Sequence, residues 1–418
     1  MASLSLSPGD YNRAVAKQAR IYLRNRYFEK NPAMSTDGFS LLARPGRRFY
    51  QTVGAGPIRG IYEAPGAFDE LFVASGDNLY SVNPADDAVV NLGAISTGSA
   101  TSHVTMAACA SIGEETPANL FVCDGETLWA YTKNGFAVGQ LTAVTILDND
   151  VVEIAGTYYK FTSGSVNAGT PTGLIGAPWL VLLGLTVNLS IENLYQALTM
   201  TGTAGTTYST VMTANPQAYG YNRSGSALYI RAISPGYLGN YITTTETGAN
   251  MSWGAATLAG GGSPSLIPVL MPEDAGCISI AHINSYIIAI PSQDSLSSGR
   301  FYWVAPGEIK IEVLDYATAE RSPDPITQVI VFSDQVWLCG RQTTEPWIAT
   351  GDVDAPFVRY SGILFDRGVW EGTAVQVKES LVLVDNDGAV FQIAGGLKRI
   401  SRPDIEERIR KAITAAAA

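Results

Sequence analysis

Apolar runs of four or five residues, each followed by a short polar turn and a second apolar run, recur along the chain. The clearest copies are LFVASGDNLYSVNP from Leu71, LFVCDGETLWAYTKNG from Leu120 and LVLVDNDGAVFQIAGG from Leu381. Two weaker copies begin at Tyr286 and Val329. Each copy is typical of a strand, a tight turn containing Gly, Asp or Asn, and a second strand. The pattern therefore predicts a mainly β chain built from repeated units.

The spacing of the five copies is regular except at one place. Their apolar positions nearest the turn are separated by 49, 167, 49 and 45 residues, at Leu71, Leu120, Ile287, Val336 and Leu381. A period of roughly 40–50 residues with several short strands per unit is typical of a β-propeller. The long interval holds about 120 extra residues. We interpret them as a small α+β domain inserted between the second and third blades.

Residues 141–262, the predicted insert, are rich in Thr, Gly and Ala and poor in charge. VVEIAGTYYKFT predicts a hairpin that turns at Gly156. WLVLLGLTV at 179–187 is the longest apolar run; it predicts a buried pair of strands, with an exposed docking patch as the alternative. Nine residues cannot cross a bilayer, so no membrane insertion is expected. The glycine run at 260–262 is the expected flexible exit.

Two segments carry helical periodicity. SIENLYQALTM predicts a helix capped by Ser190, and its apolar residues recur on one face at Ile191, Leu194, Tyr195 and Leu198. RPDIEERIRKAITAAAA predicts a C-terminal helix that begins near Pro403, with Ile405, Ile409 and Ile413 along one side. AVAKQARIYLRNRYFEKNP, near the start, fits either a helix or a basic strand.

These patterns divide the chain into five parts. They are an N-terminal basic segment with an initial strand (1–50), the first propeller blades (51–140), the inserted α+β module (141–262), the remaining blades (263–397) and a C-terminal helix or tail (398–418).

Charge is unevenly distributed along the chain. The net charge is −11, but residues 1–50 carry about +6 and residues 398–418 about +3, which leaves about −20 for the body. Proteins that read DNA carry a basic stripe on the working face, and this chain does not. Basic ends suit docking onto acidic partner surfaces, with ordinary solvated faces as the alternative. The candidate docking residues are Arg13, Lys17, Arg20, Arg24, Arg26, Arg408, Arg410 and Lys411.

Candidate chemistry is sparse. The four cysteines form no CxxC pair and are expected to be buried thiols, and the two histidines, His103 and His282, are expected to be structural. CDGETLW faintly resembles an Asp-box, but Asp124 is better explained as a turn residue. DNDG at 385–388 lacks the downstream Glu of a calcium loop. We assign no catalytic, cofactor-binding or metal-binding residue, and we expect neither enzyme activity nor a cofactor.

Several motifs follow one another along the chain. An Arg-Pro-Gly start (Arg44, Pro45, Gly46) precedes Gly60-Ile61-Tyr62 and the hairpin Asn78-Leu79-Tyr80. A second motif comprises Asp315, Ala317, Ala319, Glu320, Pro323 and Asp324, and a third comprises Gly340, Thr343, Glu345 and Trp347. With RISRPDIEERIRK, these motifs in this order resemble the packaged-DNA stabilisation proteins of short-tailed phages, also called tail hub or nozzle proteins, over roughly residues 40–135 and 275–411. The family extends beyond this last stretch, so the five repeats are not expected to form the complete propeller.

The insert separately resembles a module spliced into many phage tail and virion proteins, through VEIAGTYYKF, ENLYQAL, SPGYLGNYITTTE and ATLAGGG. The two resemblances together imply a virion component in the phage tail, assembled in the host cytoplasm. They imply a homo-oligomer, with six copies in a ring below the portal-adaptor ring and beside needle, tailspike or fibre proteins. Genomic double-stranded DNA would pass through its lumen without sequence recognition.

Two other functions remain open at the level of the sequence. One is a carbohydrate- or receptor-binding virion protein that acts through the inserted module. The other is a propeller glycosidase, which would need two close carboxylates in a central pocket. An acidic body favours the conduit, since a lumen that attracted DNA phosphates would slow the passage of the genome.

Overall fold

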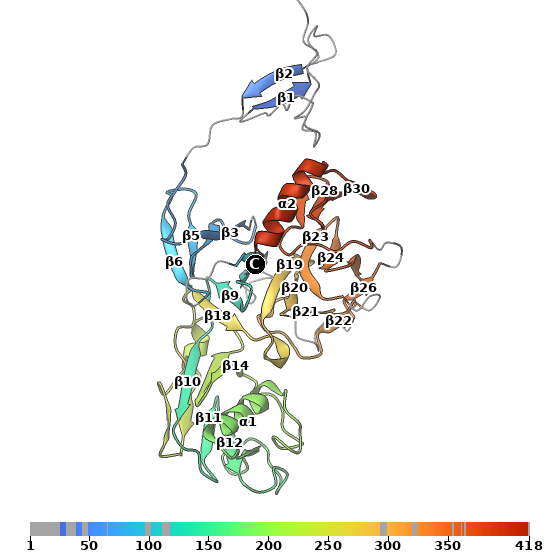
Figure 1. Ribbon diagram of the computed structural model, residues 1–418. Helices are drawn as coiled ribbons and strands as arrows, with labels where there is room; N and C mark the ends of the chain where they lie inside the picture. The colour runs from blue at the N-terminus through green and yellow to red at the C-terminus, as the bar shows by residue number, and fades with distance from the viewer. Residues whose placement is uncertain are drawn as a thin grey trace, which may run out of the picture. The chain divides into compact units, whose positions relative to one another are not determined.

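The computed structural model describes residues 26–30, 39–43, 49–64, 66–96, 102–110, 118–292, 299–319, 324–352, 355–360, 362 and 365–416. The chain divides into two compact units, residues 53–366 and residues 1–52 with 367–418 (Figure 1). Strands predominate in both units, so the prediction of a mainly β protein is confirmed.

Four of the six four-stranded sheets described in residues 53–366 are repeated antiparallel units, which we call blades 1 to 4. Blade 1 comprises β3 (Ile58–Glu63), β4 (Leu71–Ser75), β5 (Asn78–Val82) and β6 (Val89–Ala94). Blade 2 comprises β7 (Thr105–Cys109), β8 (Asn119–Cys123), β9 (Leu128–Thr132) and β18 (Ser265–Val269). Blade 3 comprises β19 (Cys277–Ile283), β20 (Tyr286–Pro291), β21 (Arg300–Val304) and β22 (Tyr316–Thr318). Blade 4 comprises β23 (Ile326–Phe332), β24 (Gln335–Gly340), β25 (Thr344–Ala349) and β26 (Phe357–Arg359).

The first strands of these blades, β3, β7, β19 and β23, lie next to one another in chain order. Three of them have an irregular register near the start, so that Arg59, Ile278 and Thr327 have no ladder partner. Hydroxyls on first strands also accept N–H groups from the next blade: Thr105 accepts from Ile280 (3.2 Å) and Ser279 accepts from Val329 (3.1 Å). The blades are therefore repeated units that pack side by side, as in a propeller.

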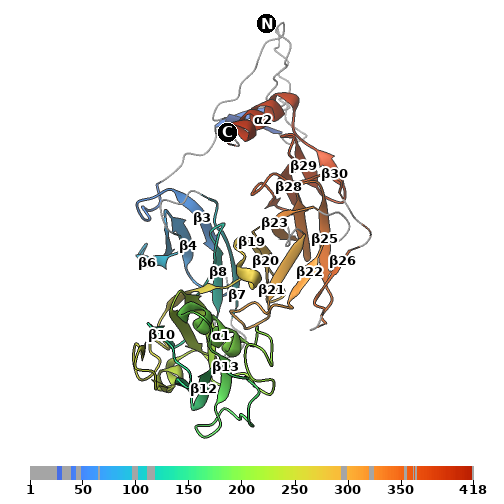
Figure 2. The same ribbon diagram turned by 60° about the horizontal axis from the view of Figure 1, so that its bottom comes forward.

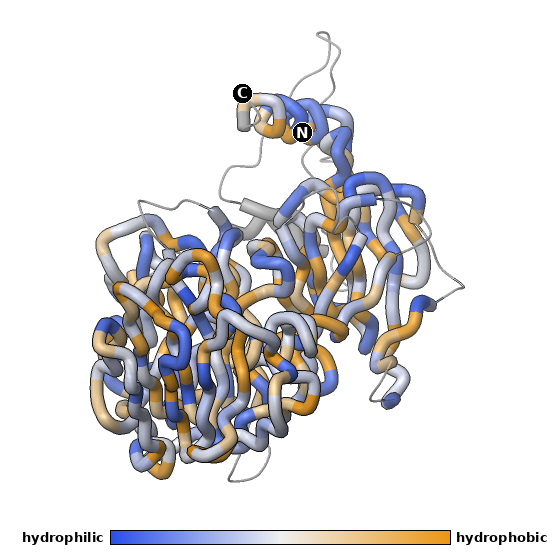
Figure 3. Tube along the Cα trace, turned by 90° about the horizontal axis from the view of Figure 1, so that it is seen from below, coloured by the Kyte–Doolittle hydropathy of each residue, from blue (hydrophilic) through white to orange (hydrophobic). Residues whose placement is uncertain are grey.

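Short apolar stretches are interspersed with polar ones along the chain, as the hydropathy colouring shows (Figure 3). Blades 2 and 3 each pack against a neighbouring blade on either side, which covers both faces of their central strands. In β8 all five residues are buried, and in β4 four of five are. This explains why the strands were visible in the sequence as short continuous apolar runs.

The extra residues leave and rejoin the propeller within blade 2, which corrects the prediction that they lie between the second and third blades. β18 follows them and pairs with β9, with Thr132 opposite Ser265. The two segments that connect the extra residues to blade 2 are hydrogen-bonded to each other. Gly135 N–H donates to the Ser263 carbonyl (2.8 Å), and Gly262 N–H donates to the Gly135 carbonyl (3.0 Å). The glycine run therefore belongs to a hydrogen-bonded pair of connecting segments and is not the flexible exit that was predicted.

We call the residues between these connecting segments the 138–259 segment. Its first sheet has the order β14 (Ala218–Ser224), β15 (Ala227–Ala232), β10 (Val138–Ala143) and β17 (Met251–Trp253). Its second sheet has the order β13 (Trp179–Leu182), β12 (Thr157–Thr162), β11 (Val151–Ile154) and β16 (Thr244–Glu246). Helix α1 (Val187–Thr199) and the short 3₁₀ helix η1 (Tyr237–Tyr241) complete the segment.

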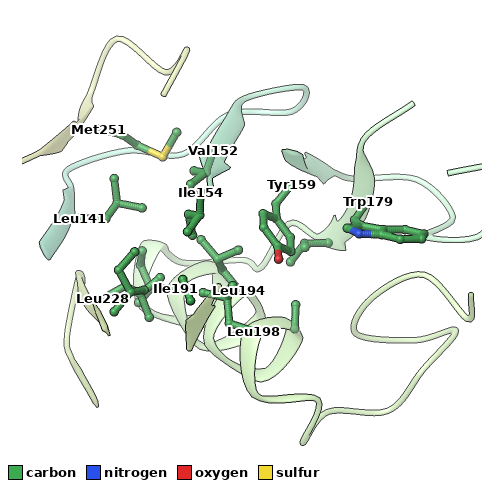
Figure 4. Close-up of a cluster of buried hydrophobic side chains, with 14 of the residues drawn as sticks. Leu141, Val152, Ile154, Tyr159, Trp179, Ile191, Leu194, Leu198, Leu228 and Met251 are labelled. Carbon is green, nitrogen blue, oxygen red and sulfur yellow. The ribbon is translucent and has the colours of Figure 1, made fainter. Parts of the chain in front are cut away.

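The two sheets and α1 enclose a hydrophobic core that belongs to the 138–259 segment alone (Figures 2 and 4). Figure 4 shows Ile191, Leu194 and Leu198 of α1 facing Leu141, Ile154 and Tyr159 of the strands. All six side chains are at most 2% exposed. The predicted apolar face of the helix is confirmed at these three positions, and Tyr195 is only partly buried.

The helix begins earlier than the sequence pattern indicated. Thr186, and not Ser190, is the N-cap, since its hydroxyl accepts the Leu189 N–H at 3.2 Å. Ser190 lies inside the helix and is buried, where its hydroxyl donates to the Thr186 carbonyl (3.1 Å) and accepts from Gly184 N–H (3.0 Å). A serine inside a helix can bond the carbonyl four residues back, so its presence alone does not mark a cap.

The run WLVLLGLTV forms one strand and not the predicted pair. β13 takes its first four residues and pairs in parallel with β12. Leu185 is then 98% exposed in the turn before α1. A composition that is apolar throughout cannot reveal that the chain leaves the sheet in the middle of the run.

The second unit contains blade 5 and helix α2. Blade 5 comprises β27 (Val375–Val377), β28 (Ser380–Val384), β29 (Val390–Ile393) and β30 (Leu397–Arg399), and α2 spans Pro403–Ala416. The predicted start of this helix at Pro403 is confirmed. β1 (Arg26–Lys30) and β2 (Phe39–Ala43) pair as antiparallel strands, so the described part of the basic N-terminal pattern, Arg26–Lys30, is strand.

Helix α2 lies over the β28–β29 turn. A Cβ at Gly388 would be 3.0 Å from both the Arg410 nitrogen and the Glu406 carbonyl, so only glycine permits this approach. The Glu406 carboxylate is buried and accepts hydrogen bonds from Arg399 and Ser401. The helix is therefore fixed to blade 5 by backbone contact and by one buried carboxylate.

Candidate functional site

The candidate docking residues fall into two groups. Arg13, Lys17, Arg20 and Arg24 lie outside the described residues, and Arg26 begins β1. Arg408, Arg410 and Lys411 lie on α2 and are all exposed. Arg410 Nε donates to the Asp387 carbonyl (3.2 Å), and Lys411 pairs with Glu407 one turn back (2.9 Å). The helix thus presents a basic exposed surface beside blade 5.

In the two acidic turns noted in the sequence, the Asp side chains accept hydrogen bonds from backbone N–H groups of the same turn. One carboxylate oxygen of Asp124 accepts the N–H groups of Glu126 (2.9 Å) and Thr127 (2.6 Å). Asp385 in the DNDG turn accepts those of Asp387 (3.0 Å) and Ala389 (2.7 Å) in the same way. Both side chains therefore form Asx-type turns, as predicted for Asp124. Within the described residues, no group of three or more His, Cys, Asp or Glu side chains could hold a metal ion.

An arginine joins the Asp124 turn to the neighbouring blade. Arg59, the residue without a ladder partner in β3, is 5% exposed and donates to Ser102 O (2.8 Å), Gly76 O (3.0 Å) and Asp124 O (3.0 Å). It also donates to the hydroxyls of Ser96 (2.7 Å) and Ser102 (2.9 Å). Because every donor has a partner inside the protein, this arginine stabilises the packing of blades 1 and 2 and offers nothing to a ligand.

One histidine bonds the backbone of a hairpin turn, and the four cysteines are buried. His282 Nε2 accepts the Ser285 N–H (3.2 Å) at the end of a hairpin, which confirms its structural role. His103 is exposed and lies two residues before β7. All four cysteines are free and buried, as predicted. Burial raises the pKa of the Cys109 and Cys339 thiols to about 12, so these thiols are inert.

Two of the sequence motifs meet in one turn of blade 4. The Asp324 carboxylate accepts the N–H groups of Arg341 (3.0 Å), Gln342 (2.7 Å) and Thr343 (2.7 Å). A Cβ at Gly340 would be 2.3 Å from an Asp324 oxygen, so glycine is required beside the carboxylate. Glu345, also buried, accepts the Trp347 indole N–H (2.9 Å). These motif residues stabilise a turn and a strand, which explains their residue types without invoking catalysis.

The site that sequence reasoning missed is centred on Arg231, in the middle strand β15 of the 138–259 segment. Two cavities of about 400 and 350 Å³ lie where this segment meets blades 2 and 3, and Arg231, Tyr219 and Lys310 line both. Lys310 comes from the loop between β21 and β22 of blade 3. The only signal in the sequence was a single charge within the apolar strand ALYIRA, and a lone charge in a strand is usually at the surface.

Charged and aromatic groups surround the smaller cavity. Arg223 lies 4.5 Å over the Tyr195 ring and pairs with Glu192 of α1 and with Asp274 (3.0 Å) in the turn that follows β18. That turn is the short 3₁₀ helix η2 (Pro272–Asp274), in which Glu273 and Asp274 both have positive φ. Burial raises the pKa of Tyr195 to about 12. The Arg223–Asp274 pair joins the 138–259 segment to the propeller, and the Arg223–Glu192 pair lies within the segment.

Comparison with known proteins supports the fold and one family. Residues 237–417 match the family model described as Bacteriophage P22 Gp10, β-propeller. The match covers less than half of the chain and supports a family of phage structural proteins. Together with the strand order it establishes a mainly β propeller. A search of curated proteins gave no match.

Solved structures similar to this chain include other propellers. The β-propeller domain of Cps50 (Swd1) from Myceliophteria thermophila is 9% identical, with 85% of this chain and 88% of that chain covered and a TM-score of 0.33. YCF48 from Cyanidioschyzon merolae is 8% identical, with 84% and 85% covered and a TM-score of 0.30. Hsv2 from Kluyveromyces lactis is 8% identical, with 85% and 78% covered and a TM-score of 0.25. Scores this low add nothing to the strand pairing already described.

Proposed function

We propose that the protein is a structural component of a phage tail, a nozzle or hub that forms a ring below the portal-adaptor. In this role it conducts the genome and retains packaged DNA until ejection, without catalysis. The observation that carries the proposal is the match of residues 237–417 to a phage structural β-propeller family.

The distribution of charge supports a conduit. The body of the chain carries about −20, which repels DNA phosphates and favours passage over binding. The carboxylates of Asp124, Asp324 and Asp385 accept backbone N–H groups in turns, so they are not arranged as an acid–base pair. Helix α2 exposes Arg408, Arg410 and Lys411 to an acidic neighbour, such as a second copy of the chain or the adaptor ring.

The mass of the assembly tests this role. Native mass spectrometry of the purified chain, and of the complex released from particles, should give a ring of six copies. A chain that stays monomeric at high concentration and is absent from particles would contradict the proposal.

The docking role of α2 needs a separate variant. Arg408→Glu combined with Lys411→Glu should weaken assembly and make it less sensitive to salt, because rim charges act mainly through long-range attraction. Lys378→Glu, an exposed charge reversal in the β27–β28 turn of blade 5, is the matched control and should assemble normally. Equal loss in both variants would show that net charge matters and the helix does not.

In the part of the chain that the structure describes, neither α-helix has the length and apolar character needed to span a bilayer.

A further inference from the structure

Arg231 is a buried cation that forms no ion pair with any carboxylate among the described residues. The residue is 4% exposed, and within that part of the chain it makes one hydrogen bond, from Nη1 to the Ala232 carbonyl (3.3 Å). Its guanidinium carbon lies 4.5 Å from the centre of the Phe136 ring and 5.5 Å from that of Tyr219. Burial lowers the pKa of Arg231 to about 10. A guanidinium has five N–H donors, so most of its hydrogen-bonding capacity is unused.

The remaining donors reach the larger cavity, of about 400 Å³, because Arg231 lines it. Its walls include parts of β14 and β15, the C-terminal end of α1, the start of β8 in blade 2, and the blade 3 loop that carries Glu308 and Lys310. A volume of this size is at the lower end of the range for small-molecule sites. It therefore suits one or two sugar rings, or a molecule of similar size.

A second unmatched group lines the same cavity. Asn119, at the start of β8 in blade 2, is 3% exposed, and its Oδ1 atom has no hydrogen-bond partner among the described residues. A buried acceptor without a donor is destabilising, so an unpaired amide is uncommon in a folded protein. The neighbouring amide of Asn215 is fully bonded, to Ile154 O (3.0 Å) and from Gln217 N (2.9 Å). Of these two amides in the cavity wall, only that of Asn119 has an oxygen without a partner among the described residues.

Other charges on the wall restrict which anion could enter. Lys310 pairs with Glu312, and its ammonium lies 5.0 Å from the centre of the Tyr219 ring. Glu308 is exposed; no salt bridge joins it to Arg231, but its negative charge raises the pKa of Arg231 and so partly opposes the effect of burial. Phosphate, which carries more negative charge than a single carboxylate group, would be repelled by the carboxylates of Glu308 and Glu312. A ligand with one carboxylate and several hydroxyl donors would satisfy both kinds of group.

We infer that this cavity binds a carboxylate-bearing sugar, of the hexuronic acid class. The sugar carboxylate accepts from the Arg231 fork, a geometry that arginine favours. A ring hydroxyl donates to Asn119 Oδ1, and another donates to Glu308. The buried side chains of Phe136 and Ile309 provide an apolar wall for the C–H face of the ring. The inference goes beyond the structural role proposed above and does not depend on assembly into a ring.

Calorimetric titration of the full chain tests the ligand class. D-Glucuronate should bind at least about tenfold more tightly than D-glucuronamide, its neutral isostere, or D-glucose. Inorganic phosphate should not compete. A glucuronate-terminated oligosaccharide is titrated in parallel. Tighter binding of the oligosaccharide than of free glucuronate would identify the ligand as the terminal residue of a glycan. Equal binding of glucuronate and glucuronamide, tight binding of phosphate, or no binding of any uronate would overturn the assignment.

Variants test the residues. Arg231→Lys keeps the positive charge but loses the planar guanidinium that can donate two parallel hydrogen bonds to a carboxylate. It should weaken glucuronate binding by about tenfold or more. Asn119→Leu should also weaken binding while leaving the protein at least as stable, because it removes an unpaired buried amide. Arg300→Gln, outside this cavity, is the control. If Arg231→Lys does not fold, unchanged glucuronate affinity in Asn119→Leu still overturns the placement of the sugar.

Discussion

Arg59 and Asp124 lie on neighbouring blades, and the Arg59 guanidinium donates to the Asp124 carbonyl at 3.0 Å. The same carbonyl accepts from the Ser102 hydroxyl at 2.6 Å, and Ser96 donates to an Asp124 carboxylate oxygen at 2.9 Å. Arg59 is available for this contact because the irregular register of β3 leaves it without a ladder partner. A turn that looked like a possible active site is therefore the point where two blades are joined.

Replacing Arg59 should be costly. Arg59→Met would remove a donor from the carbonyls of Gly76, Ser102 and Asp124, which lie in a partly buried network, and a polar group left without a partner there costs about 1–3 kcal/mol. We expect the free energy of unfolding, measured by urea titration, to fall by at least about 2 kcal/mol. Arg300→Gln removes an exposed ion pair with Glu273 and should cost about 0–1 kcal/mol. Similar values for the two variants would mean that the Arg59 network contributes little.

The 138–259 segment should be removable. Thr132 and Ser265 are opposite each other in adjacent antiparallel strands, so replacing residues 133–264 by Asn-Gly should close β9 and β18 as a two-residue hairpin. Because the segment has a core of its own, the shortened chain should keep its β-sheet circular dichroism and cooperative unfolding. It should lose glucuronate binding together with Arg231. Failure to fold would show that the segment is integral to blade 2.

Gly388 should be more sensitive to alanine than Gly395, although both have φ near +75° in blade 5. Gly395→Ala meets no atom within 4 Å and should cost only the backbone strain, roughly 1–2 kcal/mol. Gly388→Ala also forces its Cβ against the backbone of α2, so α2 should exchange amide hydrogens faster and be cleaved more readily by proteases. Equal protection of α2 in the two variants would argue against close packing of the helix on this turn.

The attachment of α2 should depend on pH through Glu406. Hydrogen bonds from Arg399 and Ser401 hold the pKa of this carboxyl below its usual value. A carboxyl with a lowered pKa binds protons less tightly when folded, so its stabilisation is complete above the unfolded pKa, about 4.3. That stabilisation is lost as the pH falls through the folded pKa.

Thermal unfolding of the Glu406→Gln variant tests this dependence. The variant should be less stable at neutral pH, and the difference from the native chain should shrink as the pH falls below about 4. Glu407→Gln is the matched control, because Glu407 is exposed and pairs only with Lys411. A constant difference across the pH range would show that the Glu406 charge is not what holds the helix.

Part of this protein was readable from its sequence because the relevant interactions are local. The turns at Asp124 and Asp385 bond their own backbone within four residues, so residue type and spacing suffice to identify them. The apolar runs at Leu71, Leu120 and Leu381 marked strands, and their period indicated a propeller.

Tertiary structure alone decided the rest, because it depends on which segments meet. β18 could not be assigned to blade 2 from a five-residue apolar run, since its partner β9 lies more than 130 residues earlier. Thr186 is the N-cap of α1 and Ser190 is not, because β13 ends at Leu182 and the helix begins soon after it. Arg231 and Asn119 lie more than 100 residues apart, and their unmet charge and amide line one cavity only because the 138–259 segment packs against blades 2 and 3. Local preferences fix a strand or a turn, whereas the burial of a charge is set by everything that packs around it.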